Sequence, residues 1–260
     1  MMEVLILPQD VAAELVARHI LTLIQHKPDA VLGLATGSTP LPVYRALERL
    51  IAEWEVDTSR VRGFALDEYV GLPEGHPQSY RAVITREVIE PLRLTPSQIR
   101  VPNGATETIK DAPAEYEAEI AASGGVDLQL LGLGGNGHIG FNEPGSSLGS
   151  STRVKTLTAQ TRHDNARFFP SEDEVPRHCI TQGVSTILKA RHLVLLAFGE
   201  SKAQAVAAAV EGPISASNPA SALQLHPHTT VLVDEAAARH LSNAEYYASS
   251  YRNKPDWQAL

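Results

Sequence analysis

The sequence predicts an α/β fold in which helices cover both faces of a mostly parallel sheet. Short apolar runs without polar alternation recur along the chain, as expected of parallel strands that are buried on both faces. Amphipathic or alanine-rich segments fall between almost all of these runs. In such folds the ligand site lies outside the carboxyl ends of the strands, so the loops there deserve the closest reading.

The first part of the chain alternates strictly between strand and helix. The apolar run Val4–Leu7 is expected to form the first strand, and a helix is expected over Asp10–Gln25. Near-helical spacing in that segment is shown by Val11, Leu15, Val16, Ile20 and Leu23. The run Ala30–Ala35 then leads through an amphipathic helix at Pro42–Glu53 to a third strand at Val61–Leu66.

The rest of the chain continues this pattern with one interruption. Helices are expected at Ser79–Ile89 and Ala112–Ala122, followed by a strand at Val126–Leu133. Beyond the interruption the strand, helix and strand expected are His192–Phe198, Ser201–Val210 and Thr230–Val233. Residues 146–187 do not continue the alternation of strands and helices, and their composition is not that of a linker. We therefore expect one domain over residues 1–260, with 146–187 as a lid-like insertion beside the site.

Composition argues against several classes of protein. The chain has 260 residues, of which 43% are apolar, enough for a full core. Its net charge of −8 disfavours general binding to nucleic acid or to a membrane surface, since such proteins are basic. The single cysteine, Cys179, cannot form an internal disulfide, and neither a signal peptide nor a membrane-spanning run is apparent. We expect a cytoplasmic protein.

A glycine-rich loop after the strand at Val126–Leu133 is the most informative segment, and it reads GGNGHIGFNEPG. Its glycines allow the backbone to approach a ligand closely. His138 suits proton exchange near neutral pH, and Glu143 or Asn136 would fix its tautomer. Metal ligation is disfavoured, because the loop has no HExxH arrangement and Cys179 has no CxxC partner.

Other strand ends carry further polar groups. The loop 36–39 would hold an oxyanion such as phosphate at a helix N-terminus, or would simply cap that helix. Asp67 and Glu68 directly follow a strand, where a desolvated carboxylate makes a better general base; the alternative is capping of the next turn. Lys202, in the first turn of a helix, is either an anion partner or a solvated surface lysine, and Arg167 is a second candidate anion partner.

In this order, the segments LATGSTPLPVYRAL, FALDEYVGL, LGLGGNGHIGFNEPGSSL, ARFF and GESKA closely resemble the glucosamine-6-phosphate deaminases over nearly the whole chain. The related 6-phosphogluconolactonases share a GH-containing loop but lack FNEP. The resemblance implies a Rossmann-like three-layer fold and a sugar phosphate substrate. It also implies conversion of glucosamine 6-phosphate and water to fructose 6-phosphate and ammonia, by ring opening, aldose–ketose isomerisation and deamination. Neither a metal nor an organic cofactor is implied.

The resemblance also implies roles for single residues. His138 would move a proton at the ring oxygen, oriented by Glu143 and Asn136, and Asp67 would transfer a proton between C2 and C1. These roles suit the residue types, because ring opening needs a group that cycles near neutral pH, whereas the transfer between carbons needs a carboxylate over one face. Other members carry aspartate where this chain has Asn136, so the site here holds one fewer negative charge.

Two further sets of residues follow from the same resemblance. The substrate phosphate would be held by Gly37, Ser38, Thr39, Arg167 and Lys202. The activator N-acetylglucosamine 6-phosphate, which hexameric members bind, would be held by Ser146, Arg153, Lys155 and Thr156. For Arg153 and Lys155 the alternative is a solvated strand face. Because the family includes allosteric hexamers and smaller non-allosteric forms, activation and homo-oligomer formation stay open at this point.

Two other functions are alternatives to a deaminase. A 6-phosphogluconolactone hydrolase of the same superfamily would need an activated water but no base over C2, so Asp67 favours the deaminase. A sugar-phosphate-binding module, such as the effector domain of a regulator, is disfavoured by the acidic chain and by its complete acid–base set.

Overall fold

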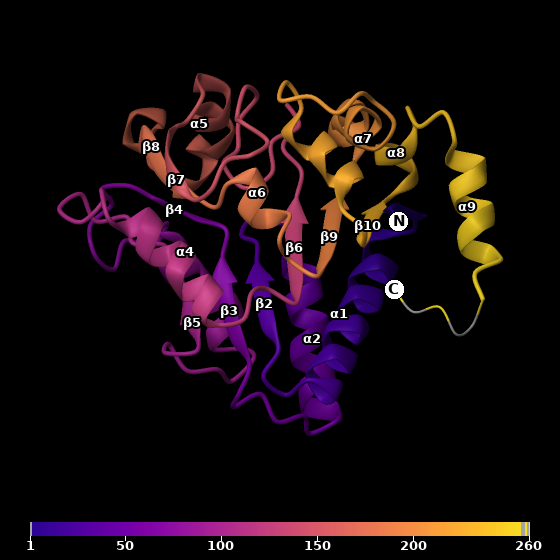
Figure 1. The fold of residues 1–260 in the computed structure, drawn as a ribbon, viewed down its shortest axis with the longest axis horizontal. Helices are drawn as coiled ribbons and strands as arrows, with labels where there is room; N and C mark the ends of the chain where they lie inside the picture. The colour runs from indigo at the N-terminus through magenta and orange to yellow at the C-terminus, as the bar shows by residue number, and fades with distance from the viewer. Residues whose placement is uncertain (1, 256–257, 259) are drawn as a thin grey trace.

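The computed structural model describes residues 2–255, 258 and 260 of the chain. Within these residues, seven parallel strands form a sheet in the order β1-β10-β9-β6-β2-β3-β5 (Figure 1). The strands are β1 (Met2–Ile6), β2 (Val31–Leu34), β3 (Arg62–Ala65), β5 (Ile99–Arg100), β6 (Leu128–Gly132), β9 (His192–Ala197) and β10 (Thr229–Val233). All of them except β5 come from the predicted apolar runs, so the predicted α/β class is confirmed.

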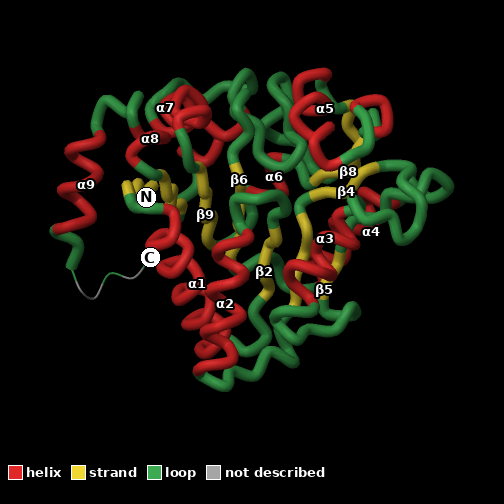
Figure 2. The backbone as a smooth tube through the Cα atoms, turned by 180° about the vertical axis from the view of Figure 1, so that it is seen from behind, coloured by secondary structure: helices red, strands yellow, loops and turns green. Residues whose placement is uncertain are grey.

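Helices cover both faces of this sheet, as the alternation predicts. On the face toward the viewer in Figure 2, α1 (Gln9–His26) packs against α2 (Leu41–Glu53). The opposite face, toward the viewer in Figure 1, carries α4 (Ala112–Ala122) and α6 (Val184–Ile187). Apolar side chains of α1 are buried at positions 12, 13, 16, 17, 20, 21 and 24, so the predicted stripe is right at Val16 and Ile20 but wrong at Val11, which is exposed.

Two predicted helices are divided in the structure. The segment Ser79–Ile89 forms α3 (Tyr80–Ile84), capped by the Ser79 hydroxyl, and then a π-helical turn over Thr85–Ile89. The segment Ser201–Val210 forms a 3₁₀ turn over Glu200–Lys202 and then α7 (Ala203–Val210). Lys202 therefore lies immediately before α7 rather than inside its first turn.

A small antiparallel sheet lies beyond the carboxyl end of β3. Among the described residues it contains β4 (Asp67–Tyr69), β8 (His178–Thr181) and β7 (Arg153–Thr156), in the order β4-β8-β7. The helix α5 (Ala159–Asn165) follows β7 and is capped by the Thr158 hydroxyl. A second apolar cluster packs beneath this region, formed by Tyr69, Phe141, Leu157, Phe169, Val175 and Cys179. Residues 146–187 thus form regular structure around a small apolar core that they share with Tyr69 and Phe141.

The last elements are α8 (Glu235–Ala238) and α9 (Ala244–Arg252), which the sequence pattern does not predict. Helix α9 buries none of its own residues and lies along β1, where Lys254 forms an ion pair with Glu3 at 2.8 Å. No helix in the described part of the chain is both long and apolar enough to cross a membrane.

A group of histidines lies at the amino ends of β9 and β10. The ring of His192 contacts His19 Nε2 at 3.1 Å and Thr230 Oγ1 at 2.9 Å, and it stacks on His228 at 3.7 Å between centroids. Burial, followed by the neighbouring His228, lowers the pKa of His192 to about 3 and that of His19 to about 4. These rings are therefore neutral and pack at the amino ends of the strands, whereas the predicted site lies at the carboxyl ends.

Candidate active site

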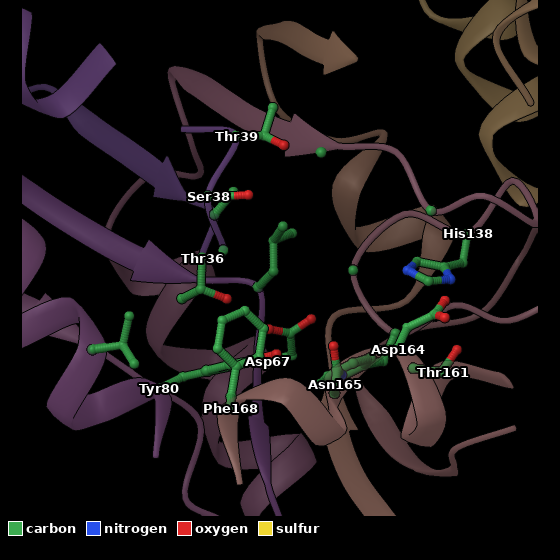
Figure 3. A pocket seen from close by; sticks show the side chains of 18 of the residues that line it. Thr36, Ser38, Thr39, Asp67, Tyr80, His138, Thr161, Asp164, Asn165 and Phe168 are labelled. Atoms are coloured by element: carbon green, nitrogen blue, oxygen red, sulfur yellow. The ribbon is translucent and has the colours of Figure 1, made fainter. Parts of the chain in front are cut away.

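A cavity of about 810 Å³ opens at the carboxyl ends of β2, β3 and β6. Its walls come from the loops that follow these strands, from α3 and from the segment around α5. Figure 3 shows Ser38 and Thr39 on one side of the cavity and His138 on the other, with Asp67 and Tyr80 below them in this view. The cavity lies where the strand pattern places the site.

The five residues that the resemblance assigns to a phosphate all line this cavity. Gly37 adopts a φ of 89°, so the loop before α2 turns in a conformation that favours glycine. Arg167 and Lys202 line the same cavity as Ser38 and Thr39. Burial and the charge of Arg167 lower the pKa of Lys202, although Asp164 opposes this. Two cations that share a cavity with hydroxyls and a helix N-terminus make a site suited to an anion.

Asp67 lines the cavity and is only 6% exposed. Burial raises the pKa of Asp67 well above its usual range, and the adjacent charge of Glu68 raises it further, while the backbone N–H of Phe141 acts in the opposite direction. A carboxyl with a raised pKa is a stronger base once ionised, so Asp67 is suited to removing a proton from carbon.

Glu68 does not line the cavity, and it holds α3 in place instead. Its carboxylate accepts hydrogen bonds from the backbone N–H groups of Tyr69 at 2.8 Å, Tyr80 at 2.8 Å and Arg81 at 2.9 Å. Of the two roles that the sequence allowed for this pair, general base and cap, each thus belongs to one residue. Asp67 faces the cavity, whereas Glu68 caps the helix that brings Tyr80 to the cavity wall.

The glycine-rich loop folds tightly around His138. The Gly134 N–H donates to the His138 carbonyl at 2.9 Å, and the Gly137 N–H donates to the Gly134 carbonyl at 2.9 Å. A Cβ on Gly134 would lie 2.3 Å from His138 Cε1, so only glycine leaves room for the ring. Asn142 lies behind the loop and donates to the carbonyls of Ile139 and Gln182. The loop therefore presents His138 to the cavity.

Glu143 is buried behind His138 and does not line the cavity. Its Oε2 lies 3.6 Å from His138 Nδ1 and accepts a hydrogen bond from Asn136 Nδ2 at 2.9 Å. Burial alone would raise the pKa of Glu143, but the nearby His138 ring, Thr161 and Asn136 lower it to about 2. Glu143 is thus a permanent carboxylate beside the imidazole, as in the arrangements that orient a histidine for proton transfer.

Thr158 and Thr161 are functional candidates that the sequence reasoning missed. Both hydroxyls donate to Glu143 Oε1, at 3.2 Å and 2.5 Å. Their spacing is a helix-capping signal in the sequence, with Thr158 before α5 and Thr161 in its first turn. That signal identifies a helix start, but it gives no indication that Glu143 lies against it.

The four residues assigned to an activator lie outside the cavity lining. Ser146 is buried, Arg153 and Lys155 are half-buried on the same side of β7, and Thr156 is exposed. Within the described residues, the Ser146 hydroxyl and Arg153 Nη2 are buried without a hydrogen-bond partner. Because Arg153 Nη2 is buried, Arg153 is not simply a solvated residue on a strand face.

Comparison with known proteins identifies the family of the chain. Residues 8–233 match the model of a family described as glucosamine-6-phosphate isomerases/6-phosphogluconolactonase. A glucosamine-6-phosphate deaminase from Streptomyces avermitilis is 59% identical, and the match covers 100% of both chains. One from Bifidobacterium longum is 56% identical over 96% of both chains.

Solved structures are also similar to this chain. A monomeric glucosamine-6-phosphate deaminase has a TM-score of 0.89 and 43% identity, covering 92% of this chain and 100% of its own. The 6-phosphogluconolactonase of Leishmania guyanensis, 22% identical with a TM-score of 0.69 over 91% of this chain and 97% of its own, shares the fold. The chain therefore belongs to the family of glucosamine-6-phosphate isomerases and 6-phosphogluconolactonases.

Proposed function

We propose that this chain is a glucosamine-6-phosphate deaminase, which converts glucosamine 6-phosphate and water to fructose 6-phosphate and ammonia. The observation that carries the proposal is Asp67, a buried carboxyl with a raised pKa in the same cavity as His138. Full-length relatives that are 55–59% identical and carry this name support it. The buried free thiol of Cys179 is consistent with our placing the enzyme in the cytoplasm.

Binding of the substrate begins with its phosphate in this proposal. The N–H groups and hydroxyls of 37–39 would bind the phosphate oxygens on one side, and Arg167 and Lys202 would neutralise its charge on the other. With the phosphate fixed there, the sugar extends across the cavity between Asp67 and His138. Holding the phosphate thus orders the reacting carbons against both groups.

Ring opening follows at His138. The imidazole takes the proton of the C1 hydroxyl and delivers a proton to the ring oxygen, which breaks the bond between C1 and that oxygen and leaves an open chain with an aldehyde at C1. Glu143 stays ionised because its pKa is about 2, so it offers the ring a permanent acceptor that holds its orientation. Asn136 fixes Glu143 Oε2 from the other side at 2.9 Å.

Isomerisation then requires one base over two neighbouring carbons. Asp67 removes the proton from C2, which gives an enolamine, and returns a proton to C1, which gives a ketimine at C2. Water adds to the ketimine, and ammonia leaves as fructose 6-phosphate forms. Burial serves Asp67 in this step, because a carboxylate in a dry cavity is more basic than one in water.

We also propose regulation by N-acetylglucosamine 6-phosphate in a homo-oligomer, at Ser146, Arg153, Lys155 and Thr156. The Ser146 hydroxyl and Arg153 Nη2 support it. Neither has a hydrogen-bond partner among the described residues, so both could still bond a ligand. Sedimentation and substrate titrations with and without the activator test this proposal. A monomer whose hyperbolic kinetics do not respond to the activator would overturn it.

The deaminase proposal is tested by measuring ammonia and fructose 6-phosphate release from glucosamine 6-phosphate in the presence of EDTA. We expect stoichiometric products, and a fall in kcat of about a hundredfold to ten-thousandfold in Asp67→Asn, the usual contribution of a general base. Asp57→Asn, at an exposed carboxylate remote from the cavity, is the matched control. Hydrolysis of 6-phosphogluconolactone without any deamination would assign the chain to the lactonases instead.

A further inference from the structure

The two oxygens of the Glu143 carboxylate have separate sets of partners. Oε1 accepts from the Thr161 hydroxyl at 2.5 Å, the Thr158 hydroxyl at 3.2 Å and the Thr158 N–H at 3.4 Å. Oε2 accepts from Asn136 and faces His138. The carboxylate is therefore oriented from the α5 side by hydroxyl groups and from the glycine-rich loop by an amide.

The geometry of α5 fixes where these hydroxyls lie. Thr158 caps the helix by accepting from the Thr161 N–H at 3.2 Å, which places the two side chains next to each other, with their hydroxyl oxygens 3.1 Å apart. Thr161 is 3% exposed and lies at the cavity wall (Figure 3). An apolar side chain would fill this position without an unpaired group, so the hydroxyl is explained by its bond to Glu143.

The contact between Glu143 and His138 is sensitive to the placement of the carboxylate. His138 Nδ1 is buried and has no hydrogen-bond partner within the described residues, and Glu143 Oε2 is its neighbour at 3.6 Å. This distance is only slightly longer than a hydrogen bond. A small rotation of the carboxylate about its contacts at Oε1 would thus decide whether Oε2 forms a hydrogen bond with His138 Nδ1.

We propose that Thr161, assisted by Thr158, is a positioning residue that holds Glu143 toward His138 for ring opening. This proposal rests on the proposed deaminase function of the same site. The segment that bears Thr161 also carries Arg167, which lines the cavity at the anion end. Contact of a sugar phosphate with Arg167 is therefore linked through α5 to the orientation of the acid–base pair.

The test compares Thr161→Val, which keeps the shape of the side chain, with Thr161→Ser, which keeps the hydroxyl. We expect kcat for glucosamine 6-phosphate to fall on the order of tenfold in Thr161→Val, with KM changed by less than about twofold, and to recover in Thr161→Ser. The ¹⁵N NMR signals of the His138 ring should change in Thr161→Val, because the preferred tautomer loses its oriented acceptor.

A matched control is available at Thr186. Its hydroxyl also bonds a glutamate, Glu117, and both residues lie outside the active-site cavity. Thr186→Val should leave kcat and the His138 signals unchanged. The proposal is overturned if Thr161→Val keeps both kcat and the His138 spectrum, or if Thr161→Ser loses as much activity as Thr161→Val. Wild-type protein without deaminase activity would reject the proposed function, whereas the His138 spectra would still test the positioning.

Discussion

Acid should destabilise the fold through the histidines at the amino ends of β9 and β10. His192 is 4% exposed, and burial lowers its pKa from 6.5 to about 3. Between these two values the unfolded chain binds a proton at this residue, whereas the folded chain does not. The contribution of His192 to stability is therefore full above the unfolded pKa and is lost progressively as the pH falls below it.

The size of the effect follows from the two pKa values. Lowering the pH from about 7.5 to about 5 removes about 2 kcal/mol of unfolding free energy through His192 alone. Asp67 acts in the opposite direction, because its raised pKa lets the folded state take up a proton first. The diagnostic quantity is therefore the difference between the wild type and His192→Gln, whose side chain stays neutral at every pH.

Urea unfolding followed by circular dichroism at several pH values measures this difference. We expect the stability advantage of the wild type over His192→Gln to shrink by about 2 kcal/mol across that pH range. His240→Gln, at an exposed histidine, serves as the control and should differ from the wild type by a small, nearly constant amount. A difference between wild type and His192→Gln that does not change with pH would refute the reasoning.

Three further predictions concern the active site. Glu68→Gln should move the acidic limb of the kcat profile to lower pH, because the charge of Glu68 raises the pKa of Asp67; an unmoved limb in pH–rate measurements would contradict this. Lys202→Met should raise KM on the order of tenfold to a hundredfold by removing a charge-assisted phosphate contact, and initial rates showing an unchanged KM would exclude that contact. Gly134→Ala should lower kcat at least about tenfold, because its Cβ would overlap the active-site histidine, and initial rates at the wild-type level would exclude this overlap.

The central sheet could be predicted from the sequence because its strands are buried on both faces and so read as apolar runs. The strand β5 escaped prediction, since Ile99–Arg100 has two residues and one is exposed. The strand β7 escaped for a different reason: Arg153–Thr156 alternates between half-buried and exposed side chains, with Val154 on the exposed side. Such a pattern does not stand out from a polar loop.

Those residues of the candidate site that directly follow a strand could be predicted from the sequence. Asp67 and His138 follow strands directly, so topology alone brings them to one edge. The role of Thr161 could not be read in this way, because it depends on a contact with Glu143 across a turn and an intervening strand. Likewise, the sequence left open which of Asp67 and Glu68 faces the cavity, since neighbouring residues of a strand point to opposite sides.

The pairing of β1 with β10 has a consequence for synthesis on the ribosome. In the described sheet Met2 lies opposite Thr229, so the strand that is made first has its partner among those made last. Until β10 emerges, the apolar residues Val4 and Leu5 have no strand to pair with. The nascent chain therefore carries an unpaired apolar strand through most of translation, and factors that bind such strands would meet this protein at its amino end.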